Sequence, residues 1–406
     1  MSENIAYAGN KGENVRSDCF VTLELRGRGG NDIDIQSTVK AIYGEAIQDM
    51  AKAILNFYEV KSARLDIEDT GALPLVIAAR IETALKELVG PDEPYLLPML
   101  EENRYASKVD QFRYSHLYLP GNTPKMMINA GIHQPDGVVL DLEDSVAPNK
   151  RREARFLVRN ALRGLNFHGA ERMVRINRFP AGLKDLKYVV PHNVHVVLIP
   201  KCEVAEQVYE VEKEIHNIKD EHHTENDIFL MPVIESAQGV ENAYDIALAS
   251  DEVVAMAIGL EDYTADIGAQ RTSGGYEAFY ARSRIVNACR AAGIQPIDSV
   301  FSDVGNEAGL KSAVKESKSM GFEGMGCIHP RQIKPVREGF APGEEEIEEA
   351  KKIVNASYEA EQKGLGVVAL GTKMVDPPVV KRAQKTLDLA IFLGLIPESW
   401  REKFIS

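Results

Sequence analysis

The 406-residue sequence predicts an α/β protein, namely a (β/α)8 TIM barrel with a small N-terminal α+β domain and a C-terminal helical extension. Three observations support this fold. From about residue 111, apolar segments of strand length alternate with amphipathic helical segments, and eight such pairs fit into about 230 residues, the size of a closed parallel barrel. Charged residues follow nearly every apolar segment, as expected where barrel strands open onto an active site. An open, doubly wound sheet is the alternative for the same alternation.

Residues 1–92 are expected to form the small domain. The segments CFVTLELRG and DIDIQS alternate like two strands joined by the turn GRGGN, and STVKAIYGEAIQDMAKAILNFY is a helix with Ser37 as its N-cap. ARLDIED is a third strand, and the helix GALPLVIAARIETALKELVG is closed by Gly90. The polar residues 93–110 form a linker.

The barrel domain is expected over residues 111–342. Its strands are predicted at 116–120, 137–143, 172–177, 194–200, 228–235, 253–262, 293–300 and 325–329. Helical segments such as NKRREARFLVRNAL and AFYARSRIVNACRAA lie between them. In residues 343–406, a glutamate-rich helix, a glycine-bearing hairpin and a last helix form an extension, which is expected to pack on the barrel mouth or on a neighbouring subunit.

The composition is that of an ordinary globular protein, with 44% hydrophobic and 27% charged residues. A formal net charge of −14 argues against a nucleic-acid or anionic-membrane surface. The start of the chain lacks the apolar core of a signal peptide, and no run approaches a membrane span, so a cytoplasmic protein is expected. The four cysteines have no metal-ligand spacing and are expected to be reduced thiols without a chemical role.

Two carboxylates, Glu235 and Asp262, each follow an apolar strand in the sequence. Strands buried on both faces of a parallel sheet deliver such residues to a common mouth. Because Mg²⁺ commonly takes one or two protein carboxylates, the pair predicts a magnesium site. The alternative is that each carboxylate caps the helix that follows it.

Other polar residues also stand at the predicted strand ends, namely Glu143, Asp144, Arg175, Asn177, Arg178, Lys201 and His329. Arg175 and Arg178 could clamp a substrate carboxylate or an oxyanion, or they could form only ion pairs at the rim. His329 is predicted to be structural. The sequence has no GxGxxG after a strand, no GxxxxGK[ST] and no GxSxG, so nucleotide-binding and serine-hydrolase motifs contribute nothing.

Several motifs resemble, in the same order, those of the citrate lyase β-chain family, which includes malyl-CoA and citramalyl-CoA lyases. They are SHLYLPGNTPKMM, GVVLDLEDSVAPNKRREAR, VRINR, LIPKCE, VIESAQGVENAYDIA, GLEDYTADIG, EAFYARSRIVNACRAAGI, IHPRQI and KMVDPPVVKRA. The segments STVKAIYGEAI and ARLDIEDTGALPLVIAARIETAL resemble the citrate lyase acyl carrier chain. The chain therefore resembles a fusion of a carrier chain with a lyase chain.

The resemblance implies a Mg²⁺-dependent carbon–carbon lyase that cleaves a citryl, malyl or citramalyl type of 3-hydroxyacyl thioester into a 2-oxo acid and an acyl thioester. Glu235 and Asp262 would be the metal ligands, and Arg175 would stabilise the enolate oxygen. Asp376, supplied by a neighbouring subunit of a trimer or hexamer, would handle the proton on the enolate carbon. Arg113 and Lys125 match positions near the phosphates of CoA or a CoA-like handle.

Two departures from the family pattern matter. Met325 stands where many members carry lysine, which affects a contact with the substrate or its handle. Carrier chains bear their prosthetic group on the first serine of a Ser-Ser-Asp segment, whereas this chain has Arg16, Ser17 and Asp18 there. No covalent prosthetic group is therefore expected, although Ser17 could substitute.

Two other functions stay open on the sequence. One is a related lyase or aldolase acting on a free hydroxy or oxo acid, which the departures favour. The other is a non-catalytic scaffold that assembles with other lyase subunits.

Overall fold

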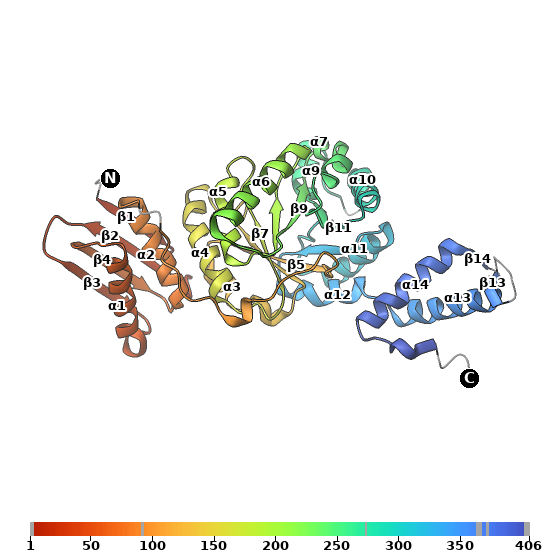
Figure 1. Ribbon diagram of the computed structural model, residues 1–406, viewed down its shortest axis with the longest axis horizontal. Helices are drawn as coiled ribbons and strands as arrows, with labels where there is room; N and C mark the ends of the chain where they lie inside the picture. Colours follow the sequence, from red (N-terminus) through yellow and green to blue (C-terminus); the bar gives the residue numbers. More distant parts are fainter. Residues whose placement is uncertain (1–3, 91–92, 273, 363–367, 371–372, 402–406) are drawn as a thin grey trace. The chain divides into compact units, whose positions relative to one another are not determined.

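The computed structural model describes residues 4–90, 93–272, 274–362, 368–370 and 373–401 (Figure 1). The chain forms two compact units, Met1–Ile333 and Lys334–Ser406. The first unit contains a small N-terminal sheet domain and a closed barrel. The second contains a helical hairpin, and each unit is described by itself.

The N-terminal domain is a four-stranded sheet covered by helices. Its strands have the order β1-β2-β4-β3. The elements are β1 (Ile5–Gly9), β2 (Cys19–Leu25), β3 (Asn31–Ser37), α1 (Lys40–Phe57), β4 (Ala63–Asp69) and α2 (Pro74–Leu88). The predicted strands and helices are thus present, and β1 is an edge strand that the sequence did not reveal.

Two details of this domain differ from the prediction. The strands β2 and β3 do not form a hairpin, because β4 lies between them and pairs parallel with β3. Ser37 ends β3 instead of capping α1, which begins at Lys40. The Ser37 hydroxyl accepts a hydrogen bond from the Val39 main-chain N–H at 3.0 Å, so it shapes the turn that leads into the helix.

The barrel consists of eight parallel strands, one for each predicted segment. They are β5 (Ser115–Pro120), β6 (Gly137–Asp141), β7 (Glu171–Arg175), β8 (Val196–Ile199), β9 (Phe229–Ile234), β10 (Ala255–Ile258), β11 (Gln295–Asp298) and β12 (Gly324–Cys327). Pairing of β12 with β5 closes the sheet, which excludes the open, doubly wound alternative. The interior is filled by apolar side chains such as Val139, Met173 and Met231.

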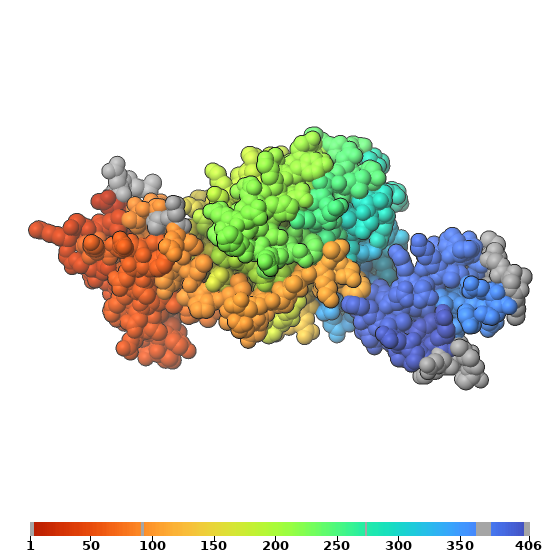
Figure 2. Space-filling view, viewed as in Figure 1, coloured from red at the N-terminus to blue at the C-terminus, as the bar shows by residue number. Residues whose placement is uncertain are grey.

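Helices follow the strands and cover the outside of the barrel (Figure 1). Figure 2 shows the outer surface that this region of the chain forms, in yellow, green and cyan. The longer ones are α4 (Arg151–Gly164), α6 (Ala205–His222), α10 (Tyr276–Ala292) and α11 (Glu307–Met320). Several strands are shorter than predicted, and the largest difference is in the strand expected at 253–262, which ends at Ile258 and leaves Asp262 in α9 (Leu260–Asp266).

The N-terminal domain is fastened to the barrel through α2, which packs against α4. Every residue of α2 from Leu75 to Leu85 is buried. Arg80 lies between the two domains, with Nη2 2.9 Å from Asp18 Oδ2 and Nη1 3.5 Å from the barrel's Glu153. A second buried pair joins Arg159 of α4 to Glu82 of α2.

The second unit contains α13 (Glu344–Gln362), β13 (Val368–Leu370), β14 (Lys373–Val375) and α14 (Pro377–Phe392). This is the predicted helix, hairpin and helix, and part of its turn lies outside the described residues. The two helices share a small apolar core that includes Ile347, Leu387 and Trp400.

All four cysteines are buried and free, as predicted. Within the described ranges, none of the helices combines the length and apolar content that a membrane crossing requires.

Candidate active site

A cavity of about 690 Å³ opens at the carboxyl ends of the barrel strands. Its wall includes Arg175, Glu235 and Asp262, the residues singled out from the sequence, together with Lys125 and His329. The barrel therefore brings the main predicted site residues to one mouth.

Glu235 follows β9 directly and is only 6% exposed. Its Oε2 accepts a hydrogen bond from the main-chain N–H of Lys201 at 3.0 Å. Burial raises the pKa of Glu235 to about 7, with Arg175 lowering it and the negative charge of Asp262 raising it further. Glu235 thus holds a proton more tightly than usual, mainly because it is buried and to a lesser extent because the carboxylate of Asp262 is near.

Neither carboxylate acts as a helix cap. Ser236 caps the helix after β9, with its hydroxyl accepting from the Gly239 N–H at 3.2 Å. Asp262 lies inside the first turn of α9, whose N-cap position is Gly259. The capping alternative is therefore wrong for both residues, and their carboxylates are available to a ligand.

The carboxylate pair fits a divalent cation of the Mg²⁺ type. Both residues offer oxygen ligands, and Asp262 is 47% exposed on its side chain, so its side chain is open to the cavity that both line. Mg²⁺ is held in proteins by one or two carboxylates and keeps other positions for water or substrate oxygens. A cation between them would also favour the charged form of Glu235, whose pKa is raised by burial and, to a lesser extent, by the charge of Asp262.

Gly259 leaves the space that Glu235 occupies. A Cβ at this position would lie 2.4 Å from Glu235 Oε1, closer than atoms tolerate. We expect Gly259→Ala to displace the carboxylate and to weaken Mg²⁺ binding about tenfold, since changes to groups that orient metal ligands cost about 10- to 100-fold in affinity. Calorimetric titration with Mg²⁺ measures this.

The matched control for this variant is Gly305→Ala, where the nearest atom to an added Cβ lies 3.6 Å away. Unchanged Mg²⁺ affinity in Gly259→Ala would contradict the assigned position of the metal site.

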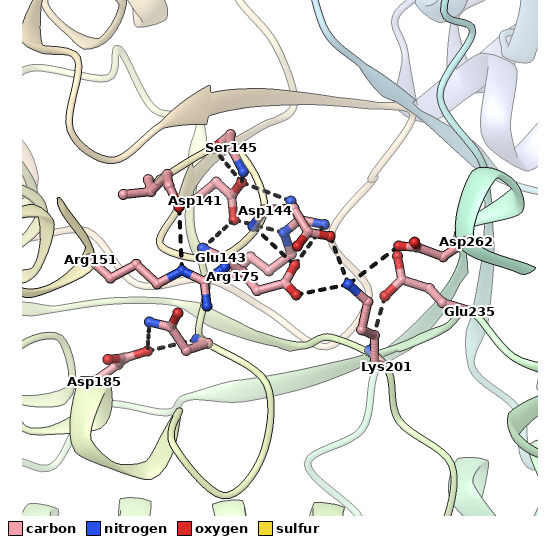
Figure 3. Close-up of polar contacts among 12 residues, drawn as sticks. Asp141, Glu143, Asp144, Ser145, Arg151, Arg175, Asp185, Lys201, Glu235 and Asp262 are labelled. Atoms are coloured by element: carbon pink, nitrogen blue, oxygen red, sulfur yellow. Dashed lines mark hydrogen bonds and ion pairs between the residues drawn. The ribbon is translucent and has the colours of Figure 1, made fainter. Parts of the chain in front are cut away.

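Arg175 ends β7 and is held by Asp141 at the end of β6 (Figure 3). Its Nε and Nη2 donate to the two Asp141 oxygens, both at 2.7 Å. Burial alone would raise the pKa of Asp141, but the hydrogen bonds from Arg175 and Ser145 outweigh it and lower the pKa. The two-point pair fixes the plane of the guanidinium, which also lies 5.5 Å from the ring of Tyr118.

Lys201 connects the acidic residues of the mouth (Figure 3). Its Nζ lies 3.0 Å from Glu143 Oε1, 2.8 Å from Asp144 Oδ2 and 3.4 Å from Asp262 Oδ2. Burial would lower the pKa of Lys201, but the hydrogen bonds to Asp144 and Glu143 raise it above its usual value. The ammonium group therefore stays charged and partly neutralises the acidic mouth.

The prediction for Arg113 is wrong. Arg113 precedes β5 and is 1% exposed at the opposite, amino-terminal end of the barrel. Its Nε donates to Glu171 Oε2 at 2.8 Å and its Nη1 to Gln295 Oε1 at 2.9 Å, both at the starts of their strands. Arg113 thus joins three strands at the base of the barrel and cannot reach a ligand at the mouth.

Other predicted residues take varied positions. Lys125 is exposed and lines the cavity, whereas Arg178 is exposed but lies outside the cavity wall. Asn177 is buried and donates to Asp185 at 2.8 Å. His329 lines the cavity and also accepts from the Arg331 N–H at 3.1 Å, which agrees with a structural role.

Met325 does not face the mouth. It is 3% exposed within β12, and the cavity wall contains the next residue, Gly326. Because successive strand residues point to opposite sides of a sheet, Met325 points away from the interior. The methionine therefore removes no contact at the cavity.

Asp376 belongs to the second compact unit. It caps α14, with Oδ1 accepting from the Val379 N–H at 3.1 Å. Its predicted role at a neighbouring mouth stays a prediction.

The segment that matches the carrier attachment site is also described. Arg16 is exposed, Ser17 is half-buried with a φ of 56°, and Asp18 is buried against Arg80. The expectation that no prosthetic group is attached there stays a prediction.

Sequence reasoning missed two residues of the mouth. Asp141 and Tyr118 both lie within segments that were assigned as strands, and both line the cavity. Asp141 could have been predicted, because it is a charged residue in an otherwise apolar strand. A buried charge of this kind needs a partner of opposite charge.

Two families match the chain. The family described as HpcH/HpaI aldolase/citrate lyase matches residues 114–330, and the family described as malonate decarboxylase delta subunit (MdcD) matches residues 7–88. The chain is 39% identical to citrate lyase subunit beta of Leuconostoc mesenteroides over 284 residues, which cover 69% of this chain and 94% of that protein. It is 34% identical to human mitochondrial citramalyl-CoA lyase, over 68% of this chain and 85% of that protein.

The fold is also similar to solved structures. The protein CitE from Mycobacterium tuberculosis, in complex with magnesium, acetoacetate and coenzyme A, matches with a TM-score of 0.58 and 30% identity, over 69% of this chain and 98% of that chain. The same protein with magnesium and pyruvate matches with a TM-score of 0.53 and 28% identity, over 69% of this chain and 100% of that chain. With its closed barrel and the charged mouth described above, this chain belongs to the HpcH/HpaI aldolase/citrate lyase family and is a carbon–carbon lyase carrying an acyl-carrier-like N-terminal domain.

Proposed function

We propose that this chain is a Mg²⁺-dependent lyase that cleaves a 3-hydroxyacyl thioester of citryl, malyl or citramalyl type into a 2-oxo acid and an acyl thioester. The observation that carries the proposal is that Glu235, Asp262 and Arg175 line one cavity at the barrel mouth. Relatives named citrate lyase subunit beta, citramalyl-CoA lyase and L-malyl-CoA/beta-methylmalyl-CoA lyase support the substrate class.

Glu235 and Asp262 would hold the metal, since they offer the oxygen ligands that Mg²⁺ prefers. When bound, Mg²⁺ would act as a Lewis acid toward the oxygens of the 2-oxo acid half of the substrate. Lys201 keeps the neighbouring Glu143 and Asp144 paired, so that these carboxylates do not add to the repulsion at the metal ligands.

Arg175 is the group that we assign to the enolate oxygen. Asp141 occupies its Nε and Nη2, whereas Nη1 has, among the residues that the structure describes, only Glu143 Oε2 at 3.6 Å, which is longer than a hydrogen bond. The N–H groups of Nη1 can therefore donate to a substrate oxygen. A donor held in place before the reaction stabilises charge that develops on that oxygen as the carbon–carbon bond breaks.

The proton on the enolate carbon is assigned to Asp376 of a neighbouring subunit, in a trimer or hexamer of this chain. Support comes from the position of Asp376 at the start of α14, where its carboxylate is half-buried. The site would then be completed by assembly, and general acid–base transfer by a positioned carboxyl group contributes about 10²- to 10⁴-fold.

The thioester handle is proposed to be CoA or a CoA-like group, with Lys125 at the rim near its phosphates. Lys125 is exposed and lines the cavity, and a similar solved structure contains coenzyme A. We place the enzyme in the cytoplasm, because its four cysteines are buried, free thiols.

The test is an assay of the purified full chain with citryl-CoA, malyl-CoA and citramalyl-CoA, with and without EDTA, beside the free acids. We expect turnover of at least one ester, its loss in EDTA and its return with excess Mg²⁺. Turnover of the free acids at an equal rate would favour the lyase or aldolase that needs no thioester. No turnover of any substrate by the assembled chain would favour the scaffold.

A further inference from the structure

A second cavity, of about 900 Å³, lies between the N-terminal domain and the barrel and shares no lining residue with the mouth. Lys86 and Leu96 contribute from α2 and the chain that follows it. The barrel contributes the outer face of α4 and the segments just before β8 and β9. Because these segments precede their strands, the cavity lies at the amino-terminal side of the barrel, away from the mouth.

The lining of this interdomain cavity is cationic. Arg152, Phe156, Arg159 and Arg163 are spaced three and four residues apart, so they share one face of α4. Lys86 and Lys187 add two further cations, and Glu221 is the one carboxylate among the lining residues that the structure describes. This concentration of positive charge occurs in a chain whose net charge is −14.

Part of the charge is neutralised by neighbouring carboxylates. Arg159 forms its buried pair with Glu82, and Arg152 Nη1 lies 3.3 Å from Glu87 Oε2 at the surface. These two arginines therefore contribute little net charge to the cavity.

Arg163 is different, because no carboxylate in the described part of the chain lies within ion-pair distance of it. Its Nε and Nη2 donate to the Leu97 carbonyl at 2.9 and 2.8 Å, and its Nη1 lies 3.3 Å from His192 Nδ1. Lys187 is exposed and has no ion pair among the described residues either. A half-buried guanidinium satisfied only by neutral groups keeps its full charge facing the cavity.

The titration of the neighbouring groups agrees with a positive potential. Burial lowers the pKa of Arg163, and the charges of Arg159 and Arg104 lower it further. Burial also holds the pKa of His192 well below its usual value, and the charges of Arg159, Arg163 and His222 lower it further. His192 is therefore neutral and adds no charge to the lining, in which Glu221 is the carboxylate.

The ends of α2, α4 and α6 lie around this cavity, and helix carboxyl ends attract cations. Each end is equivalent to only about half a negative charge, which falls off within one turn. The helix ends and Glu221 therefore offset part of the charge of Arg163 and Lys187.

We propose that this interdomain cavity binds a phosphate-bearing anion, with Arg163 and Lys187 as its principal ligands. The Leu97 carbonyl accepts from Nε and Nη2 of Arg163, so the remaining N–H groups of Nη1 and Nη2 would donate charge-assisted hydrogen bonds to phosphate oxygens. The cavity has the volume of an ordinary ligand site of about 300–1,000 Å³, which is enough for a nucleotide. A ligand there contacts both domains and stabilises their packing.

The test uses calorimetric titration of the full chain with pyrophosphate and with ATP at physiological salt. We expect saturable binding of pyrophosphate. ATP should bind more tightly than pyrophosphate if its nucleoside also contacts the cavity, and equally tightly if only its phosphates do. Lys187→Gln is expected to weaken binding about tenfold, because a hydrogen bond to a charged group contributes about 1.5 kcal/mol or more. Lys187 is exposed and has no described ion pair, so the variant leaves the fold intact.

Two control variants locate the binding. Lys184→Gln removes an exposed lysine from the same segment outside the cavity lining, and Lys315→Gln removes an exposed lysine on α11 that lines neither cavity. Both are expected to bind pyrophosphate as the parent does. Absence of saturable binding, or an equal loss in Lys184→Gln or Lys315→Gln, would overturn the proposal, and neither result depends on lyase activity.

Discussion

Arg175→Lys is expected to lower kcat by about 100-fold or more, with a much smaller change in KM. Lysine keeps the positive charge but lacks the fork that Asp141 holds at two points of 2.7 Å. The donor aimed at the enolate oxygen would lose its fixed position, and removal of one such donor costs about 10²- to 10³-fold in kcat. Steady-state kinetics on the CoA ester found to be the substrate measures the effect.

Arg178→Lys is the matched control, because Arg178 is a neighbouring arginine that lies outside the cavity wall. It should retain the parent's kcat. If Arg175→Lys stays within about threefold of the parent, Arg175 is not the group that stabilises the transition state.

Glu235→Gln is expected to abolish measurable Mg²⁺ binding and to lower kcat by about a thousandfold. The amide keeps the shape of the side chain but removes the ligand's negative charge. A Lewis acid contributes several kcal/mol to charge stabilisation, and each 1.36 kcal/mol is a factor of ten in rate. Glu206→Gln, an exposed acidic residue on α6, is the control and should bind Mg²⁺ normally.

The same residue gives a pH dependence. Glu235 has a pKa of about 7 in the metal-free protein, so a proton competes with Mg²⁺ below that pH. The apparent Mg²⁺ affinity should fall by up to about tenfold for each pH unit below 7 and level off above it. Calorimetry between pH 5.5 and 8.5 at about unit steps tests this window, and a flat profile in the parent protein would contradict the assignment.

The effect of pH on the folding stability of the metal-free protein runs in the opposite direction to its effect on Mg²⁺ affinity. Because the folded pKa of Glu235 lies above its usual value of 4.5, its protonated form favours the folded metal-free protein below about pH 4.5. That contribution disappears as the pH rises through about 7, where Mg²⁺ takes the place of the proton.

The barrel could be predicted because its strands are continuous apolar segments separated by amphipathic helices. Few folds other than a closed barrel or an open parallel sheet have this alternation. Glu235 could be predicted for the same reason, since it directly follows such a segment. Asp262 was assigned correctly to the mouth but to the wrong element, because no turn residue other than Gly259 separates β10 from α9.

The remaining misses have physical causes. Arg113 precedes β5 by two residues, and a strand places the residue before its start at the base of the barrel instead of the mouth. Asp141 and Tyr118 depend on partners from other strands, which local pattern does not reveal. The edge strand β1 is short, and its pairing with β2 is a long-range contact without a hairpin signal.

The helix α2 is buried on all sides, and this burial bears on whether the N-terminal domain can move away from the barrel. A carrier domain that delivers its cargo to several partners must dissociate from each of them. The helix face that it uses for docking is then exposed to solvent and has to be polar enough for that. From Leu75 to Leu85, α2 has no such face, because its own sheet covers one side and α4 the other. Departure would wet an apolar surface at about 25 cal/mol for each Å². The N-terminal domain is therefore expected to stay packed on the barrel through α2.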